Sequence, residues 1–325
     1  MIRAGYHDAM SFFAILFALL IEQARPLGKQ SAVRGVAGAW VGWAGRNFDT
    51  GRSPHAGLAW FIAVGVPTLL ALSVHWLLLE WLGWPFAAVW HVAVLYLTLG
   101  FRQFSHYFTE IRDALDAGDE ALARTILAKW KPIEAADLPR KEIIRRVIEH
   151  SVISAHRFVF GVFAWYSVCA AIGLGPAGAA LYRMAELVQR SWREQSPSEG
   201  QGASPAVQRV SMDLWRMIDW LPCRITALGF AIVGSFEDAI DRWRQHSQRN
   251  PGDNDGVILA ATSGALNVRL DAESEWASAA SEAGEAFGGR EPQIGHLAQV
   301  VGLVWRSVVV WMVLLALLTL AQLLG

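Results

Sequence analysis

The side chains best suited to acid–base or ligand-binding chemistry stand at the ends of three apolar segments. Histidine, arginine, glutamate and aspartate in such places can exchange protons or hold an anionic ligand. If the three ends lie on one face of a membrane, these side chains would converge into one polar pocket. The candidate ligand-binding residues, to which we assign no catalytic role, are His150, His156, Arg157, Arg183, Glu186, Asp219 and Arg224.

Spacing and motif content argue against a metal or a cofactor. His150 and His156 are six residues apart, so at helical spacing they face different ways and a shared metal is not expected. The chain has no GxxxxGK[ST], no GxGxxG after a strand, no GxSxG and no HExxH. Cys169 and Cys223 lie in or beside apolar segments without a CxxC, which is typical of small buried side chains. We therefore predict neither a bound metal nor a cofactor.

The charged candidates also have purely structural interpretations, which the sequence leaves open. Arg157 and Arg183 are suited to anchoring on lipid phosphates at a membrane interface. Asp219 and Arg224 flank Pro222, as they would where a helix begins just before the apolar residues 225–236.

Composition indicates a membrane protein. The chain has 325 residues, of which 54% are hydrophobic and 18% charged, with a net charge of −1. Long apolar stretches alternate with polar blocks, and there is no excess of positive charge for binding nucleic acid. We predict an all-α integral membrane protein with about four to six membrane-embedded helices, some short or re-entrant, and a cytoplasmic helical layer.

The clearest membrane element is a hairpin of residues 58–82 and 85–100, kinked at Pro67 and turning at Gly83. Four tryptophans near the turn resemble an interfacial aromatic belt. The other predicted membrane segments are a retained N-terminal anchor at 12–21, one bent span or hairpin at 158–172 and 177–181, a short re-entrant or buried helix at 225–236, and a C-terminal span at 303–324.

Loop charge predicts the orientation and the division of the chain. Basic residues outnumber acidic ones between the anchor and the hairpin, which places that segment in the cytoplasm by the positive-inside rule. We expect an anchor and hairpin at 1–100, cytoplasmic amphipathic helices at 101–157, a central membrane region at 158–246 with a polar linker at 194–210, a polar cytoplasmic segment at 247–302, which includes an acidic surface helix and loop from residue 271 on, and the C-terminal helix at 303–325.

One turn inside the charged block can be predicted in detail. In "ALDAGDEALARTIL", Gly118 suits the left-handed position that ends one helix, and Asp119 suits the N-cap of the next. Leu122 and Ile126 would form the apolar face of that second helix.

Four motifs, "LDAGDEALAR", "GPAGAALYR", "LPCRITAL" and "AATSGALNVRL", occur in an order that resembles the CobD/CbiB superfamily. The resemblance covers about residues 11–270. It implies a membrane protein related to enzymes that join adenosylcobyric acid to aminopropanol or its phosphate with ATP and magnesium.

Several polar positions depart from the synthase pattern. "HSVISAHRFV" stands where the synthases have Glu-Ser-Val-Ala-Glu-Asn-Leu-Val-Asp-Gly, so His150 replaces the first glutamate. Glu186 stands at an asparagine and Asp219 at another. A magnesium–ATP site needs carboxylates, so these losses argue against the ligation.

The polar positions are more similar to the AmpE-type branch, a group called signalling modulators. That branch shares the Arg157-Phe158 step and the Asp-Trp-x-Pro-x-Arg motif, here residues 219–224. The resemblance thus implies an inner-membrane sensor, modulator or binding module of the superfamily. Its expected partners are the lipid bilayer, a corrinoid or cell-wall-derived ligand and a membrane protein, but not nucleic acid.

Two further functions stay open at this point. The first is a true adenosylcobinamide-phosphate synthase, which would use ATP and magnesium. The second is a transporter, against which we count the small number of spans and the lack of a buried ionisable pair within them.

Overall fold

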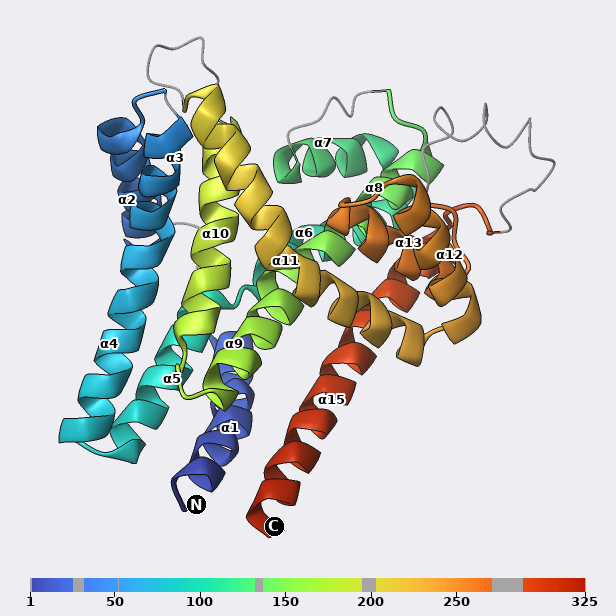
Figure 1. The fold of residues 1–325 in the computed structure, drawn as a ribbon. Helices are drawn as coiled ribbons and strands as arrows, with labels where there is room; N and C mark the ends of the chain where they lie inside the picture. The colour runs from blue at the N-terminus through green and yellow to red at the C-terminus, as the bar shows by residue number, and fades with distance from the viewer. Residues whose placement is uncertain are drawn as a thin grey trace. The chain divides into compact units, whose positions relative to one another are not determined.

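The computed structural model of the chain consists of helices (Figure 1). It describes residues 2–25, 32–51, 53–131, 137–194, 203–270 and 289–324. In those ranges the only β-type pairing is an isolated bridge between Val268 and Arg290, and there is no strand. The predicted all-α membrane fold is confirmed.

The chain forms two compact units, each assembled from distant parts of the sequence. The first unit contains Met1–Gln103, Arg157–Pro222 and Met312–Gly325, and the second contains Phe104–His156 and Cys223–Trp311. Four helices contribute residues to both units: α6 (Phe101–Asp116), the π-helix η2 (His156–Phe160), α11 (Pro205–Val233) and α15 (Ile294–Leu324).

The first unit is built around two helical hairpins. One is α4 and α5, which turn at Gly83 (φ 87°), and the other is α9 and α10, which turn at Gly173 and Gly175. Helix α1 packs on α5 and α9, while α10 packs on α9, α4 and α2. The helices of this unit are α1 (Ile2–Ala24), α2 (Ala32–Phe48), α3 (Ser53–Trp60), the π-helix η1 (Phe61–Gly65), α4 (Val66–Trp81), α5 (Trp84–Thr98), α9 (Gly161–Ala171) and α10 (Ala177–Glu194).

A π turn lies just before Pro67, the position of the predicted kink. Proline has no N–H, so Pro67 leaves the carbonyl of Ala63 without its usual helical donor. The π turn η1 directly precedes this point, and the indole Nε1 of Trp40 donates to the Ala63 carbonyl oxygen at 3.2 Å. A neighbouring helix therefore satisfies the carbonyl that the proline exposes.

The second unit is built mainly from α6, α7, α8, α12 and α13. Helix α12 packs along α13, and α8 packs on α7 and α13. Their bounds are α6 (Phe101–Asp116), α7 (Glu120–Trp130), α8 (Arg140–Ala155), α12 (Phe236–Arg249) and α13 (Asn254–Leu266), and the π-helix η2 (His156–Phe160) joins α8 to α9.

The predicted turn between α6 and α7 is confirmed, but the predicted apolar face is wrong. Gly118 has a φ of 78°, and the Asp119 carboxylate accepts a hydrogen bond from the Leu122 backbone N–H at 2.9 Å. The buried residues of α7 are Ala123 and Leu127, while 47% of Leu122 is exposed. The face is displaced by one residue from the expected one.

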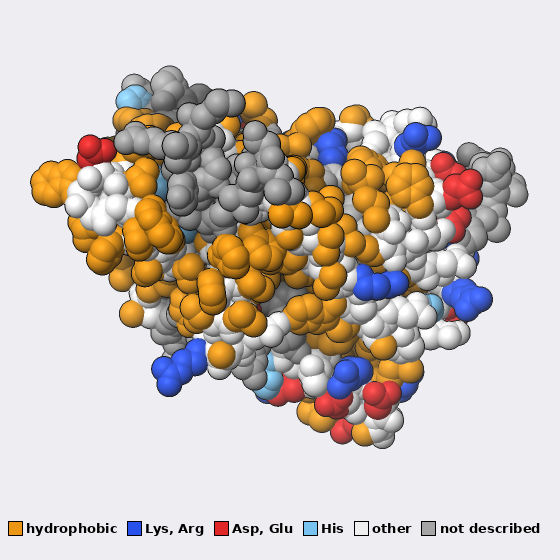
Figure 2. All heavy atoms as spheres, turned by 90° about the horizontal axis from the view of Figure 1, so that it is seen from below, with side chains coloured by type: hydrophobic (Ala, Val, Ile, Leu, Met, Phe, Trp, Pro, Cys, Tyr) orange, Lys and Arg blue, Asp and Glu red, His pale blue; other side chains and the backbone are white. Residues whose placement is uncertain are grey.

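Three helical stretches are long and apolar enough to span a membrane: His55–Trp81, Arg140–Ala171 and Ile294–Ala321. Phe12–Ala24 and Trp84–Thr98 are shorter apolar helices. Hydrophobic side chains are exposed in quantity (Figure 2), among them Leu70, Val89 and Leu318. Trp76, Trp81 and Trp84 near the α4–α5 turn are also exposed, as an interfacial belt requires.

Two predicted boundaries need correction. Residues 225–236 do not form a separate short helix, because residues 225–233 are the last turns of the 29-residue helix α11, with Pro222 inside it. The predicted linker 194–210 lies partly outside the described residues, and α11 already begins at Pro205. Most of the predicted acidic helix and loop, residues 271–288, also lies outside them.

Candidate functional site

The structure separates the seven sequence-predicted residues into two groups. Arg157, Arg183, Glu186 and Asp219 belong to the first unit, whereas His150, His156 and Arg224 belong to the second. The first group is linked by hydrogen bonds, ion pairs and shared aromatic neighbours, and we call it the arginine site.

Helix α10 supplies the centre of the arginine site. Arg183, Glu186 and Arg190 follow at i, i+3 and i+7, so they lie on one face of the helix. Arg183 Nη1 donates to Glu186 Oε2 at 2.9 Å, and Arg190 Nη1 lies 3.6 Å from Glu186 Oε1. The Glu186 side chain is 2% exposed, so this carboxylate is a buried counterion for two guanidinium groups.

Electrostatics keep Glu186 ionised. Glu186 lies in α10, which is not one of the three helical stretches that are long and apolar enough to span a membrane. Burial alone would raise the pKa of Glu186, but the positive charges of Arg183, Arg190 and Arg157 outweigh it and lower the pKa below the usual 4.5. The carboxylate therefore stays charged at neutral pH.

Asp219 is bound by Tyr182, the residue that precedes Arg183 on α10. The Tyr182 hydroxyl donates to Asp219 Oδ1 at 2.8 Å, and both residues are fully buried. Burial and the Asp219 carboxylate raise the pKa of Tyr182 far above its usual range, so the hydroxyl remains a donor. Gly161 permits this approach, because a Cβ there would lie 2.1 Å from the Tyr182 ring.

Aromatic rings fix the direction of two guanidinium groups. The guanidinium carbon of Arg183 lies 4.4 Å from the centre of the Phe158 ring, and that of Arg157 lies 5.8 Å from the centre of the Trp215 ring. Trp215 also contacts Tyr182 at a ring-centre distance of 5.2 Å. A stacked guanidinium is held in one plane and presents its N–H edge to an acceptor.

The three candidates of the second unit make separate contacts. His156 Nδ1 lies 2.9 Å from the Thr226 hydroxyl, and Arg224 Nη1 donates to Asn254 Oδ1 at 3.3 Å. The His150 imidazole packs edge-on against Trp130, 4.5 Å between ring centres.

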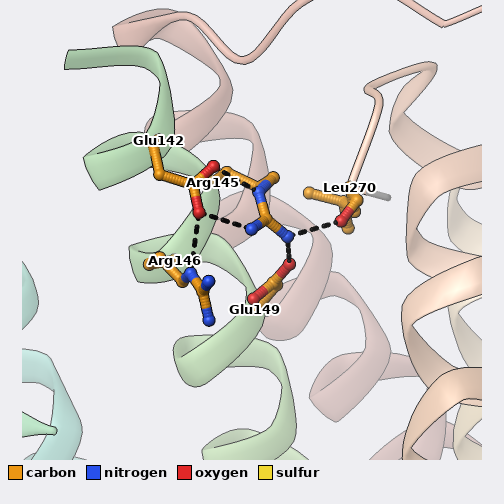
Figure 3. Close-up of polar contacts among 5 residues, drawn as sticks. All are labelled: Glu142, Arg145, Arg146, Glu149 and Leu270. Carbon is orange, nitrogen blue, oxygen red and sulfur yellow. Dashed lines mark hydrogen bonds and ion pairs between the residues drawn. The ribbon is translucent and has the colours of Figure 1, made fainter. Parts of the chain in front are cut away.

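Sequence reasoning missed an ionic network on α8 in the second unit (Figure 3). Arg145 Nε donates to Glu142 at 2.7 Å, Arg146 Nε donates to Glu142 at 2.8 Å, and Arg145 also pairs with Glu149. Arg145 Nη1 reaches the backbone oxygen of Leu270 at 3.0 Å. The signal in the sequence was the i, i+3 and i+4 spacing of opposite charges. This network binds the end of the "SGALNVRL" motif to α8.

Sequence reasoning also missed a buried polar chain in the first unit. His91 Nδ1 lies 2.8 Å from the Tyr166 hydroxyl, and His91 Nε2 lies 3.1 Å from His75 Nδ1. All three residues are buried, and they come from α5, α9 and α4. The expectation that the spans contain no buried ionisable pair is therefore wrong. His75 and His91 are 16 residues apart on the two arms of one hairpin. The sequence alone could not predict that they meet, because it does not show which sides of the two helices face each other.

Within the described residues, no three side chains of histidine, cysteine, aspartate or glutamate are grouped as a metal site would require. The chemistry that the arginine site offers is recognition of an anion, because its acids are paired internally and its cations outnumber them.

The sequence profile of a family described as CobD/CbiB protein matches residues 12–304. A Stutzerimonas stutzeri protein named cobalamin biosynthesis protein CobD is 28% identical over 276 residues, which cover 84% of each chain. The protein of that name from Chromobacterium violaceum is 28% identical over 68% of this chain and 67% of its own length. The one from Leptospira interrogans is 27% identical over 66% and 64%. No solved structure matches the chain significantly.

Proposed function

The chain belongs to the CobD/CbiB protein family, and we propose that it acts there as a ligand-binding membrane protein without ligase chemistry, comparable to the AmpE-type modulators that its polar motifs resemble. The inner membrane, with the polar segments on the cytoplasmic side, is its proposed location. The ligand would bind at the arginine site.

One observation carries this proposal: the acids of the site are already engaged. Asp219 accepts from Tyr182 at 2.8 Å, and Glu186 pairs with Arg183 and Arg190. A magnesium–ATP site uses carboxylates that can face the metal and the phosphates. Here the Glu186 carboxylate is instead the counterion of two arginines, and the Asp219 carboxyl group is the acceptor of the Tyr182 hydroxyl.

A second candidate function is the synthase itself, an ATP-dependent amide synthesis with magnesium. It is favoured by a different observation, that a relative matching 84% of the chain is named for cobalamin biosynthesis. If the chain is a synthase, other residues would have to take over the binding of magnesium and ATP from the synthase carboxylates that are missing here.

Complementation distinguishes the two functions. The chain is expressed in a strain that lacks cobinamide-phosphate synthase and must make its own corrinoid, with a synthase of the family as positive control. We expect no growth although the protein is present in the membrane fraction. Full rescue would overturn the binding-module proposal and establish the synthase.

A further inference from the structure

The buried polar chain of the first unit lies inside its most apolar helices. His75 of α4, His91 of α5 and Tyr166 of α9 are each at most 1% exposed. His75 and Tyr166 belong to two of the three stretches that are long and apolar enough to span a membrane, and His91 belongs to the shorter apolar helix Trp84–Thr98. Ionisable side chains inside membrane segments are costly, so their presence points to a function.

The hydrogen bonds of this chain determine how many hydrogens it holds. His91 Nε2 lies 3.1 Å from His75 Nδ1, and His91 Nδ1 lies 2.8 Å from the Tyr166 hydroxyl. A bond between two ring nitrogens needs one hydrogen, because one nitrogen donates and the other accepts. When both rings are neutral they carry two hydrogens in all. The Tyr166 hydroxyl then donates to His91 if His91 donates to His75, and it accepts if the direction is reversed.

One added proton fits the two rings, and a second does not. With a third hydrogen, the outer nitrogens His75 Nε2 and His91 Nδ1 are both N–H groups, and one hydrogen is shared between the rings. The positive charge strengthens the shared bond, and the Tyr166 hydroxyl accepts from His91 Nδ1. A fourth hydrogen would set two N–H groups and two positive charges against each other at 3.1 Å.

The α9–α10 turn contacts His75 through one of its two glycines. A Cβ at Gly175 would lie 2.6 Å from the His75 ring carbons and 2.9 Å from Nδ1, the atom that meets His91. Gly175 has a φ of 56° and Gly173 a φ of 79°, so both lie in the region that favours glycine. A Cβ at Gly173 would meet no described atom within 4 Å.

Other ionisable groups lie on the helices that pack around the two histidines. Those with described side chains are Glu22 on α1, Glu80 on α4, Tyr96 on α5, Cys169 on α9, and Tyr182 with the charged residues that follow it on α10. Tyr96 and Tyr182 donate to the Arg25 backbone oxygen and to Asp219, respectively, and Glu80 is exposed. The α1 side chains before Phe12, which include His7 and Asp8, lie outside the described part. All these groups stay unchanged in the variants used below.

We propose that His75 and His91 form a binding site for a single proton, which the two rings share between His75 Nδ1 and His91 Nε2. Tyr166 is the positioning residue of this site, and the α9–α10 turn covers it at His75. The proton comes from a hydronium ion, which leaves as water, and it binds the lone pair of one imidazole nitrogen. The site thereby gains one positive charge. It uses other residues than the arginine site and does not depend on the proposed function.

The test follows protonation of the full chain, purified in detergent with isotopically labelled histidine. Nitrogen chemical shifts distinguish a ring nitrogen that carries hydrogen from one that does not, and His75→Gln and His91→Gln assign the signals. We expect both rings to follow one titration curve between about pH 5 and 8. Potentiometric titration should give one proton more for the unaltered protein than for the double variant, and each single variant should lose this uptake. Two independent curves, or two rings that stay neutral over the whole range, overturn the proton site.

Gly175→Ala and Gly173→Ala are a matched pair of variants in the turn. Both place a side chain at a positive φ and share that backbone strain, but only the first would meet His75. Gly175→Ala should separate the two rings and abolish the shared proton uptake, whereas Gly173→Ala should retain it. Equal behaviour of the two variants would contradict the proposed cover.

Tyr166→Phe separates positioning from a purely structural role. Loss of the hydroxyl should change the tautomer populations of neutral His91 while the two rings still titrate together. A lower melting temperature with unchanged tautomers would show that Tyr166 only stabilises the fold. His106→Gln, which removes a histidine with a side chain 71% exposed on α6, is the control and should leave the signals of His75 and His91 unchanged. If the histidine variants do not fold, Tyr166→Phe and Gly175→Ala identify the same signals.

Discussion

At the scale of single residues, the bond from Tyr182 to Asp219 is the contact we expect to matter most for stability. Both residues are fully buried, and the hydroxyl donates to the Asp219 carboxyl group at 2.8 Å. Tyr182→Phe should lower the unfolding free energy by about 1–3 kcal/mol, because it leaves a buried acceptor without its donor. Denaturant unfolding in detergent measures this change.

Tyr96→Phe is the matched control for that prediction. The Tyr96 hydroxyl donates at 2.6 Å to the backbone oxygen of Arg25 in an exposed position, where water can replace it. Its loss should cost about 0.5–1.5 kcal/mol or less. Equal effects of the two variants would show that Asp219 does not depend on Tyr182. Asp219→Asn keeps an acceptor and should cost less than Tyr182→Phe.

Glu186 makes a prediction about acid stability. Its pKa in the folded protein is lower than the usual 4.5, because three arginines outweigh the effect of burial. The folded state then binds the proton less readily than the unfolded chain, so the stabilisation is complete above 4.5 and is lost as the pH falls through the folded value. Glu186→Gln removes this component.

The measurement is the unfolding free energy of both proteins across the acid range. The gap between them should be constant near neutral pH and should close as the pH falls. A gap that widens on acidification would mean that the pKa of Glu186 is raised instead.

Sequence reasoning located this site only in part. Arg183 and Glu186 could be predicted as candidates because charges at the end of an apolar segment stand out. Tyr182 and Trp215 could not, since an aromatic residue in an apolar run looks like core packing. The division between the two units also could not be foreseen, because His156 and Arg157 are adjacent in sequence yet belong to different units.

At the scale of helices, two prolines inside helices are compensated in the same way. Pro67 frees the carbonyl of Ala63, which accepts from the Trp40 indole, and Pro222 frees the carbonyl of Ile218, which accepts from the Trp165 indole at 2.9 Å. Such carbonyls must find a donor when water is excluded. The sequence indicated the prolines, but the indole donors come from helices whose packing it did not specify.

A double-mutant cycle tests this compensation at Pro222. Trp165→Phe leaves the Ile218 carbonyl without its indole donor and should cost about 1–3 kcal/mol beyond the loss of packing. Pro222→Ala restores a helical N–H for that carbonyl, so Trp165→Phe should cost less in its presence. Thermal unfolding of the four proteins gives the coupling energy.

Trp90→Phe serves as the reference for lost packing. The Trp90 indole donates at 3.0 Å to Ala71, which lies in α4 with no proline four residues later. That carbonyl keeps its helical donor, so this variant should cost less than Trp165→Phe. Additive effects at Trp165 and Pro222 would contradict the compensation.

At the scale of the whole molecule, the first unit makes a prediction about topology. A Cβ at Gly175 would lie 2.6 Å from the His75 imidazole, so the α9–α10 turn lies beside the last turns of α4. His75 is six residues before Trp81, about 9 Å along a helix. The α4–α5 turn and the α9–α10 turn are therefore at the same end of the unit, while α2 lies at its other end (Figure 1).

The positive-inside rule then assigns the ends. Basic residues exceed acidic ones between α1 and α4, so the α2 end should face the cytoplasm and both turns the opposite side. Single cysteines test this in a background with Cys169→Ala and Cys223→Ala, which removes the two buried native thiols. Trp81→Cys and Ile172→Cys, at positions 79% and 67% exposed, should react with a membrane-impermeant maleimide added to intact spheroplasts.

Val36→Cys, at a position 69% exposed on α2, should react only after the membrane is opened. The His75–Gly175 contact joins the two turns, so the thiols at positions 81 and 172 must share one side whichever way the protein is inserted. If only one of the thiols at positions 81 and 172 reacts in intact spheroplasts, the fold of the first unit is contradicted. Reaction of Val36→Cys alone would leave that fold intact and would reverse the orientation, placing the arginine residues of α2 outside.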